Sequence, residues 1–384
     1  MWFFYQVWKA SVKQTFRLIA RDNAVLLLLV IAPTIYCFFY GWPMQKQQVL
    51  EVPTGIVDLD HSKLSRMMIR YASASPRIRP KVFFSETSAQ QAMVKRSIEG
   101  YLVIPPYLTH DLSLDRPVKL RVYTNGSYAL LNQAVSYGFL ESMGTISAGI
   151  DLKKLTARGL SMKQARVARN PLALKLQGYF NTFGGYGRYI LPAVAIVIFQ
   201  QTLLMAVAMF IATLWETGKA YTSTAAWLGR ITVFTAISWL LGLFYFGWVF
   251  YFLDVARTGN ILGACLLLFI FSPTVVILGA LTGLLVKGRE RCLYVVIFIS
   301  LPLYFICGIS WPSEGMPAII KLFRYFVPST AAVNASLRLN QMGATLYDVR
   351  YLLLDIFLIG LVALSGLMYV GRHNSSQEKR ENAA

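Results

Sequence analysis

The chain has 384 residues, of which 56% are hydrophobic and 14% are charged, and its formal net charge is +19. Soluble globular domains carry about 25% charged residues, so this balance and a mean hydropathy of +0.50 exclude an ordinary water-soluble protein. Only three histidines are present, which leaves little for acid–base catalysis near neutral pH.

Residues 1–23 predict an amphipathic helix that lies in the plane of a membrane interface. Trp8 belongs to its apolar face. Four cations recur every four residues and form one basic stripe: Lys9, Lys13, Arg17 and Arg21. Such a helix would hold its cations against anionic lipid headgroups. The simpler alternative is that the first membrane helix continues into water.

Six apolar runs predict membrane-spanning helices, because each is close to the roughly 20 residues that a crossing requires. The runs are 24–42, 189–215, 231–253, 261–286, 293–311 and 351–371. The first five contain no Asp, Glu, Lys or Arg, and the last contains only Asp355. In lipid, backbone polar groups must find partners within the segment, so helices are expected. The predicted fold class is an α-helical polytopic membrane protein with six transmembrane helices, five of them in 189–371, and an N-terminal interfacial helix.

The distribution of basic residues predicts the orientation of these helices. Short segments on the side of the N-terminus hold twelve Lys and Arg, including those of the tail 372–384. Short segments on the other side hold five, and Arg257 is one of them. The positive-inside rule then places both termini in the cytoplasm and the long segment after the first helix outside. No small-x-small cleavage site follows 24–42, so this helix is expected to be retained.

Residues 43–188 predict an inserted mixed α/β domain, because short apolar strands alternate with helical patterns. Asn125–Gly126 is expected to form a turn, Ser88 to cap the second helix and Gly100 to end it. The expected strands are 52–59, 82–84, 101–104 and 118–123, and the expected helices are 62–73, 89–98 and 131–169.

The inserted domain is strongly basic, with 20 Lys and Arg against 9 Asp and Glu. One interpretation is a solvated surface beside anionic headgroups, and the other is a docking surface for an acidic partner. The densest stretch contains Lys153, Lys154, Arg158, Lys163, Arg166 and Arg169. Nucleic-acid binding is not expected, because no recognition fold is visible.

Two short motifs are typical of enzymes, and both have simpler interpretations. Asp58-x-Asp60 resembles a metal-binding acid pair, but two acids at a strand end are more often a turn and a helix cap. His110 and Asp115 have the spacing of some acyltransferases, and a single such pair arises easily by chance. No G-x4-G-K-[ST] phosphate loop is present, so an ATP-driven process would need another subunit. We expect no catalytic residue, metal site or cofactor in this chain.

Several stretches, in chain order, resemble an ABC-2 type permease, the membrane subunit of an ABC exporter with a large external domain after its first span. Val52–Arg66 resembles the start of that external domain, and Gly100–Pro106 resembles its G-x-x-x-I-P-P strand. Ile190–Leu204 is similar to the second span of the family. Gly308–Gly343 resembles the re-entrant segment between the fifth and sixth spans.

The resemblance implies an exporter of several subunits. Two permeases, either two copies or a copy and a paralogue, would assemble with cytoplasmic ATPase subunits that bind ATP and Mg²⁺. The substrate would be amphiphilic, lipid-like or drug-like and would leave across the bacterial inner membrane. An adaptor protein in the periplasm would be a further partner, and membrane lipid would surround the spans.

The resemblance also implies a contact with the ATPase on the loop 214–230. Family members usually carry an R-E-x-E-x-G-T-like run at this place, whereas this chain keeps one acid and places its threonine before the glycine. The residues of this candidate coupling site are Glu216, Thr217, Gly218 and Lys219.

Two further candidate regions follow from the resemblance. Gln200 and Gln201 would line the translocation pathway, and their alternative role is hydrogen bonding between helices. The re-entrant segment is expected over 312–350, with Pro312, Met316, Pro317 and Pro328. Asp355 lies near the outer end of its helix, where a nearby Arg or Lys is its expected partner.

Two other classes of function remain open. A membrane receptor or scaffold would use the basic domain for docking and would need no ATPase. A membrane-embedded transferase would depend on Asp58 or His110, and replacing either residue would abolish its activity.

Overall fold

The computed structural model describes residues 1–44, 48–172, 174, 177–182, 184–220, 222–255 and 259–381, with side chains described up to Gly371. Arg257 and residues 382–384 of the predicted tail lie outside the described residues. The chain forms two compact units. Unit 1 comprises Met1–Gln47 and Gly178–Ala384, and unit 2 comprises Gln48–Gln177.

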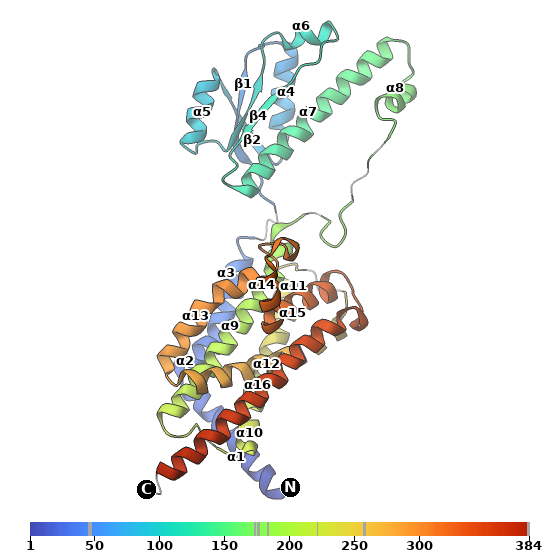
Figure 1. Cartoon of the computed structure of the whole chain (residues 1–384). Helices are drawn as coiled ribbons and strands as arrows, with labels where there is room; N and C mark the ends of the chain where they lie inside the picture. The colour runs from blue at the N-terminus through green and yellow to red at the C-terminus, as the bar shows by residue number, and fades with distance from the viewer. Residues whose placement is uncertain are drawn as a thin grey trace. The chain divides into compact units, whose positions relative to one another are not determined.

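Unit 2 is built on a small mixed sheet (Figure 1). Its strands are β1 (Val52–Asp58), β2 (Ile78–Phe83), β3 (Gly100–Ile104) and β4 (Arg121–Thr124), in the order β2-β1-β3-β4. The first three are parallel and β4 is antiparallel to β3. Parallel neighbours need crossover connections, and α4 (Lys63–Ser73) and α5 (Glu86–Val94) supply them.

Helices cover both faces of this sheet, because its strands alternate side chains between the faces. Ile56 and Leu102 pack with Phe139 of α7 (Ala129–Ala157) and with α4 on one face. Val57 and Tyr101 pack with α5 on the other. The short helices α6 (Leu108–Ser113) and α8 (Met162–Arg169) complete the unit. The predicted inserted mixed α/β fold therefore has a three-layer core.

Five predictions about the elements of unit 2 are wrong in their bounds. Ser85, and not Ser88, caps α5, whose last residue is Val94. Gly100 does not end this helix but begins β3, where a Cβ would lie 2.7 Å from the carbonyl oxygen of Tyr123. The strand predicted at 82–84 begins at residue 78, and the one predicted at 118–123 is 121–124. The helix predicted over 131–169 is broken at Gly159, whose φ of +93° favours glycine.

Among the described residues of unit 1, five helices are long and apolar enough to cross a membrane. They are Asn23–Gly41, Tyr186–Glu216, Thr224–Phe252, Ile261–Val286 and Leu346–Gly371. Their elements are α2 (Asn23–Leu26), η1 (Leu27–Ile31), α3 (Ala32–Gly41), α9 (Tyr186–Glu216), α10 (Thr224–Leu243), η2 (Phe244–Val249), α11 (Phe250–Phe252), α12 (Ile261–Val286) and α16 (Leu346–Glu381). Each contains or nearly coincides with one of the predicted runs.

The run 293–311 forms a shorter helix, α13 (Arg289–Ile306). Its first turn carries Arg289, Glu290 and Arg291, and the helix ends five residues before the run does. The apolar part therefore extends about 22 Å, against a hydrocarbon core of about 30 Å. The structure establishes a mostly helical protein with five candidate membrane helices, and a sixth crossing stays a prediction.

Helix α9 is the centre of unit 1 and contacts α3, α12, α13 and α15 (Pro328–Ser336) (Figure 1). It is apolar and buried on nearly all sides, as expected for a core helix. Helix α12 approaches it most closely at two glycines spaced by four residues. A Cβ on Gly283 would lie 2.6 Å from the carbonyl oxygen of Ala208, and one on Gly279 would lie 3.0 Å from that of Leu204.

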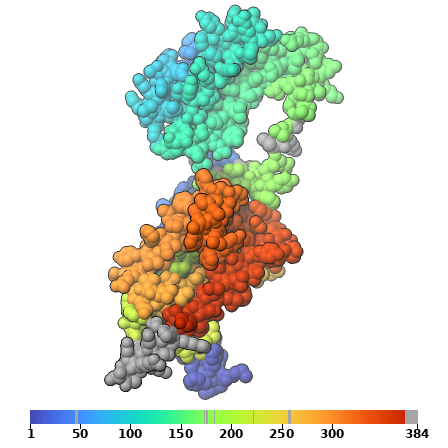
Figure 2. Space-filling model, in the orientation of Figure 1, coloured from blue at the N-terminus to red at the C-terminus, as the bar shows by residue number. Residues whose placement is uncertain are grey.

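The segment between α13 and α16 folds into short helices and turns. It contains η3 (Ser313–Gly315), α14 (Ala318–Phe323), η4 (Arg324–Phe326), α15 and η5 (Leu337–Gln341). Proline starts three of them: Pro312 precedes η3, Pro317 precedes α14 and Pro328 opens α15. Met316 is buried. Eight residues of α15 are buried, whereas none of α14 is. Helix α15 packs against α16, and the outer part of the segment is at the surface beside α16 (Figure 2, orange and red).

Candidate functional site

Helix α1 (Trp2–Arg21) presents three different faces. Its four stripe cations are exposed, and so are Phe4 and Phe16 of the apolar face. The buried face is a narrow stripe of Ser11, Thr15 and Ile19 that packs on α10. The hydroxyl of Ser11 donates to the carbonyl oxygen of Ala226 at 2.8 Å. Trp8 is half-buried, and its indole N–H donates to the hydroxyl of Thr232 of α10 at 3.3 Å. Helix α1 is therefore attached to α10 by small side chains and by Trp8, which leaves its cations and the rings of Phe4 and Phe16 free to meet a membrane surface.

The turn after α9 holds the candidate coupling residues Glu216, Thr217, Gly218 and Lys219, and all four are exposed. Gly218 has a φ of +70°, which permits the chain to reverse there. The guanidinium of Arg230 donates to the carbonyl oxygens of Lys219 and Ala220, both at 2.7 Å. Tyr221 lies outside the described residues. These hydrogen bonds from Arg230, which is in the first half of α10, hold the turn in place.

Arg289, at the start of α13, connects this turn with α1. Its guanidinium donates to both carboxylate oxygens of Asp22 at 2.6 Å and to the hydroxyl of Thr213 at 2.7 Å. Its backbone N–H donates to Glu216 at 2.9 Å. A carboxylate at the first turn of a helix is also favourable to the helix dipole. We call Asp22, Thr213, Glu216 and Arg289 the junction, because they join the ends of α1, α9 and α13.

Electrostatics favour the charged form of both partners at the junction. The hydrogen bond from Arg289 lowers the pKa of Asp22, and the same bond raises the pKa of Arg289. Asp22 also caps α2 by accepting from the N–H groups of Ala24 and Val25. Because the pKa of Asp22 is depressed in the folded state, its contribution to stability is present above the ordinary carboxyl pKa. It is lost as the pH falls through the depressed value.

Three of the four junction residues, namely Asp22, Thr213 and Arg289, were not predicted from the sequence. One signal was available for Asp22, since it is the only acid among the first 50 residues. An isolated acid beside a basic helix indicates a structural partner elsewhere in the chain. Nothing in the sequence near Arg289 identifies that partner, which lies 267 positions away.

Gln200 and Gln201 are buried inside unit 1, at 1% and 6% exposure. Neither Oε1 of Gln200 nor Nε2 of Gln201 has a hydrogen-bond partner among the described residues. An unpaired buried amide group costs about 1–3 kcal/mol. The expected hydrogen bonds between helices are therefore not found for these two atoms, and both remain available to a ligand, to water or to another arrangement of the helices.

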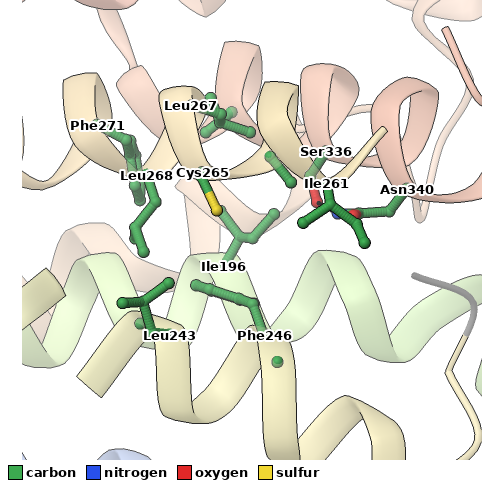
Figure 3. A pocket seen from close by; sticks show the side chains of 14 residues that line it. Ile196, Leu243, Phe246, Ile261, Cys265, Leu267, Leu268, Phe271, Ser336 and Asn340 are labelled. Carbon is green, nitrogen blue, oxygen red and sulfur yellow. Dashed lines mark hydrogen bonds between the residues drawn. The ribbon is translucent and has the colours of Figure 1, made fainter. Parts of the chain in front are cut away.

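An apolar cavity of about 390 Å³ lies beside α9, between α12 and η2 (Figure 3). Leu243 and Phe246 face Leu268 and Phe271 across it, and Ile196 of α9 forms its back. Two of its walls contain wide π-helical turns, η2 and η5, which often mark functional places in membrane helices. The cavity has the size and lining of a site for an apolar group.

The motifs of unit 2 have structural partners. Both oxygens of Asp58, which is 5% exposed, accept hydrogen bonds: Oδ1 from the N–H groups of Asp60 and His61, and Oδ2 from the hydroxyl of Ser65 at 2.7 Å. Asp58 thus closes a turn before α4. Asp115 accepts from Lys154 and Arg158, both at 2.7 Å, and not from His110.

The basic stretch of unit 2 is partly neutralised within the unit. Three of its six cations form ion pairs: Lys154 and Arg158 with Asp115, and Arg169 with Asp151. Lys153, Lys163 and Arg166 are exposed. This pairing fits a solvated surface better than a concentrated docking site for an acidic partner.

Replacing Asp58 by alanine is expected to destabilise unit 2 by about 3 kcal/mol, because three hydrogen bonds to a buried carboxylate are lost. Hydrogen exchange of peptides from β1 and α4 in the intact protein measures this effect. Asp60→Ala is the matched control. Among the described residues, the side chain of Asp60 accepts one hydrogen bond, from the hydroxyl of Thr109 at the surface, so its loss should cost less than about 1 kcal/mol. Lost activity with unchanged exchange would favour a chemical role for Asp58 instead.

Comparison with known protein families finds a match over most of the chain. A family model described as ABC-2 family transporter protein matches residues 24–367. The matched region begins with the first apolar helix, includes unit 2 and ends in α16. No curated protein matches the chain.

Proposed function

This chain belongs to the ABC-2 transporter family, and on that premise we propose that it is the membrane-spanning permease subunit of an ATP-driven exporter. The observation that carries the proposal is the length of the family match, which includes the apolar helices and the inserted unit together. ATP and Mg²⁺ are bound by a separate cytoplasmic ATPase. The chain itself supplies the pathway and no catalytic group.

We place six spans in the inner membrane of a bacterium, with both termini in the cytoplasm and the inserted domain 43–188 in the periplasm. The bias of basic residues supports this orientation. In this arrangement the run 293–311, which begins in α13, is the fifth crossing, and the re-entrant segment 312–350 follows it on the periplasmic side. Residues 1–23 form the interfacial helix, and 372–384 form the cytoplasmic tail.

Coupling to the ATPase takes place at the loop 214–230 and at α1. The exposure of Glu216 to Lys219 supports this assignment, since a partner can reach all four residues. The junction then passes movement of the loop to α1 and α13. ATP drives transport only if the ATPase binds it more tightly in one of the two states of the permease.

The substrate we propose is amphiphilic, lipid-like or drug-like. The apolar cavity beside α9 and the unpaired amides of Gln200 and Gln201 support a pathway that accepts apolar and polar groups. A second permease, a copy or a paralogue, would cover α13, whose Tyr294 and Phe298 are 66% and 83% exposed. A periplasmic adaptor would meet the inserted domain.

Affinity purification from native membranes, followed by mass spectrometry and an ATPase assay, tests the proposal. We expect a stoichiometric ATP-binding subunit with the wild-type chain. Lys219→Glu should reduce its recovery or uncouple its ATPase about tenfold, because this exposed charge lies on the contact surface. Lys81→Glu replaces another exposed lysine, in β2, and is the matched control, which should have no effect. Intact complexes without any ATP-hydrolysing subunit would refute the proposal and favour a receptor or scaffold.

A further inference from the structure

A second cavity, also of about 390 Å³, lies between the re-entrant segment and α16, and its lining is charged. Three cations line it, Lys321, Arg324 and Arg338, together with two carboxylates, Glu314 and Asp355. Asp355 therefore lines the same cavity as these cations, but the ion pair expected from the sequence is not found among the described residues. Among the described residues, no carboxylate oxygen lies within 4.0 Å of a cationic nitrogen in this cluster.

Helix α15 and η5 separate this cavity from the apolar one. Thr330, Asn334 and Arg338 recur every four residues and face the charged cavity. Ala332 and Ser336 lie two positions further along, about 200° around the helix, and line the apolar cavity. One buried helix therefore has a charged side and an apolar side, which is the division found within an amphiphile.

The charged groups are held in place without satisfying one another. The guanidinium of Arg324 lies against Gly308, and its buried Nε has no hydrogen-bond partner among the described residues. The ammonium of Lys321 donates to the backbone carbonyl oxygen of Glu314 at 3.2 Å and forms no ion pair with a carboxylate among the described residues. Asp355 is half-buried in α16, where an ionised carboxylate is costly without a partner.

We propose that this cavity binds the zwitterionic headgroup of a membrane phospholipid, with the phosphate on Arg324 and Arg338 and the ammonium on Asp355. Guanidinium groups match phosphate oxygens in pairs, and Lys321 is a third cation in the lining of the same cavity. Asp355 supplies a negative charge that pairs with the ammonium of a zwitterionic headgroup, whereas an anionic headgroup has no cation for Asp355 to bind. Phosphatidylethanolamine has this chemistry, with a small ammonium that can donate hydrogen bonds.

The inference rests on the proposed function for one point, the location of the re-entrant segment at the membrane surface. The binding measurement needs neither ATP nor a partner subunit. Failure to find an ATPase would therefore refute the proposed function without affecting the lipid site, and failure to bind lipid would refute the lipid site without affecting the proposed function.

The test is fluorescence anisotropy of acyl-labelled phosphatidylethanolamine and phosphatidylglycerol with the purified full-length protein in detergent. We expect Arg338→Gln and Arg324→Gln each to weaken binding of both lipids about tenfold, through loss of charged hydrogen bonds. Asp355→Asn should remove the preference for phosphatidylethanolamine and leave phosphatidylglycerol binding unchanged. Arg338 is exposed, so its replacement tests the site even if the Arg324 variant does not fold.

Arg350→Gln is the matched control, because Arg350 is on α16 but stacks on Tyr347 and Tyr351, and is not among the residues that line the cavity. It should bind both lipids like the wild type. Equal loss in the Arg350 and Arg338 variants, or equal binding of the two lipids by the wild type, would overturn the proposal. Soluble glycerophosphoethanolamine should not displace the labelled lipid at the same concentration, and if it did, the ligand would be a free headgroup and not a lipid.

Discussion

Replacing Arg289 by glutamine is expected to reduce ATP-driven transport about tenfold or more. Its guanidinium bridges Asp22 and Thr213 with three short hydrogen bonds, and a glutamine amide cannot reproduce them. Asp22 would then be left partly buried without its cation, which costs roughly 2–4 kcal/mol in comparable pairs. Transport into vesicles, measured together with ATP hydrolysis, is the appropriate assay. We expect the ATPase to bind and hydrolyse ATP without moving substrate.

Arg291→Gln is the matched control for this variant. Arg291 lies two residues further along the same helix, is exposed and should be replaced without loss. Arg289→Lys keeps the positive charge but lacks the paired N–H donors of a guanidinium, so an intermediate loss of transport is expected. If the Arg289 and Arg291 variants transport equally well, the junction is a structural contact only and coupling takes another route.

Membrane helices were predictable because lipid imposes a simple rule on the sequence. A crossing needs about 20 apolar residues, and each run that meets this requirement can be recognised without tertiary information. The run 261–286 has the same bounds as α12. The run 293–311 illustrates the limit of the rule, because the helix ends at Ile306 and the chain turns at Gly308, whose φ is +86°. Composition alone does not show where an apolar run stops being helical.

Strand and helix types in unit 2 were predicted well, and their ends less so. Ser85 and Ser88 are both good caps by residue type, and β2 decides between them by ending at Phe83. Gly100 could equally end a helix or begin a strand. It begins β3 because β4 approaches it too closely for any side chain. Local chemistry offers the candidates in such cases, and tertiary contacts select one.

The candidate coupling turn could be located from the resemblance, whereas the junction could not be found at all. A carboxylate and a guanidinium far apart in the sequence have no periodic signature, so no pattern pairs Asp22 with Arg289. The charged cavity is a similar case. Asp355 was noticed because it is an acid in an apolar run, but the cations around it are on other elements and only the fold brings them together.

Replacing Gly283 and Gly279 together by alanine is expected to lower the melting temperature by roughly 5–10 °C, or to prevent folding. The added Cβ atoms would lie 2.6 Å and 3.0 Å from carbonyl oxygens of α9, and helix backbone cannot move aside as a flexible side chain does. Overpacking of this kind costs about 1–3 kcal/mol per site. Each kcal/mol lowers the melting temperature of a domain of roughly 150–250 residues by about 2–4 °C, and that of a longer chain by less. Thermal unfolding of the purified protein in detergent, followed by size-exclusion chromatography, measures the shift.

Gly247→Ala separates this packing effect from the general effect of removing a glycine. Gly247 is also in a membrane helix, but a Cβ there would meet nothing within 4 Å. Alanine favours helix over glycine by about 1 kcal/mol, so this variant should be neutral or slightly more stable. The two glycine sites therefore predict shifts of opposite sign for the same chemical change. If Gly283→Ala and Gly247→Ala shift the melting temperature equally, the close approach of α12 to α9 does not hold the bundle together, and the position of α9 at its centre would need another explanation.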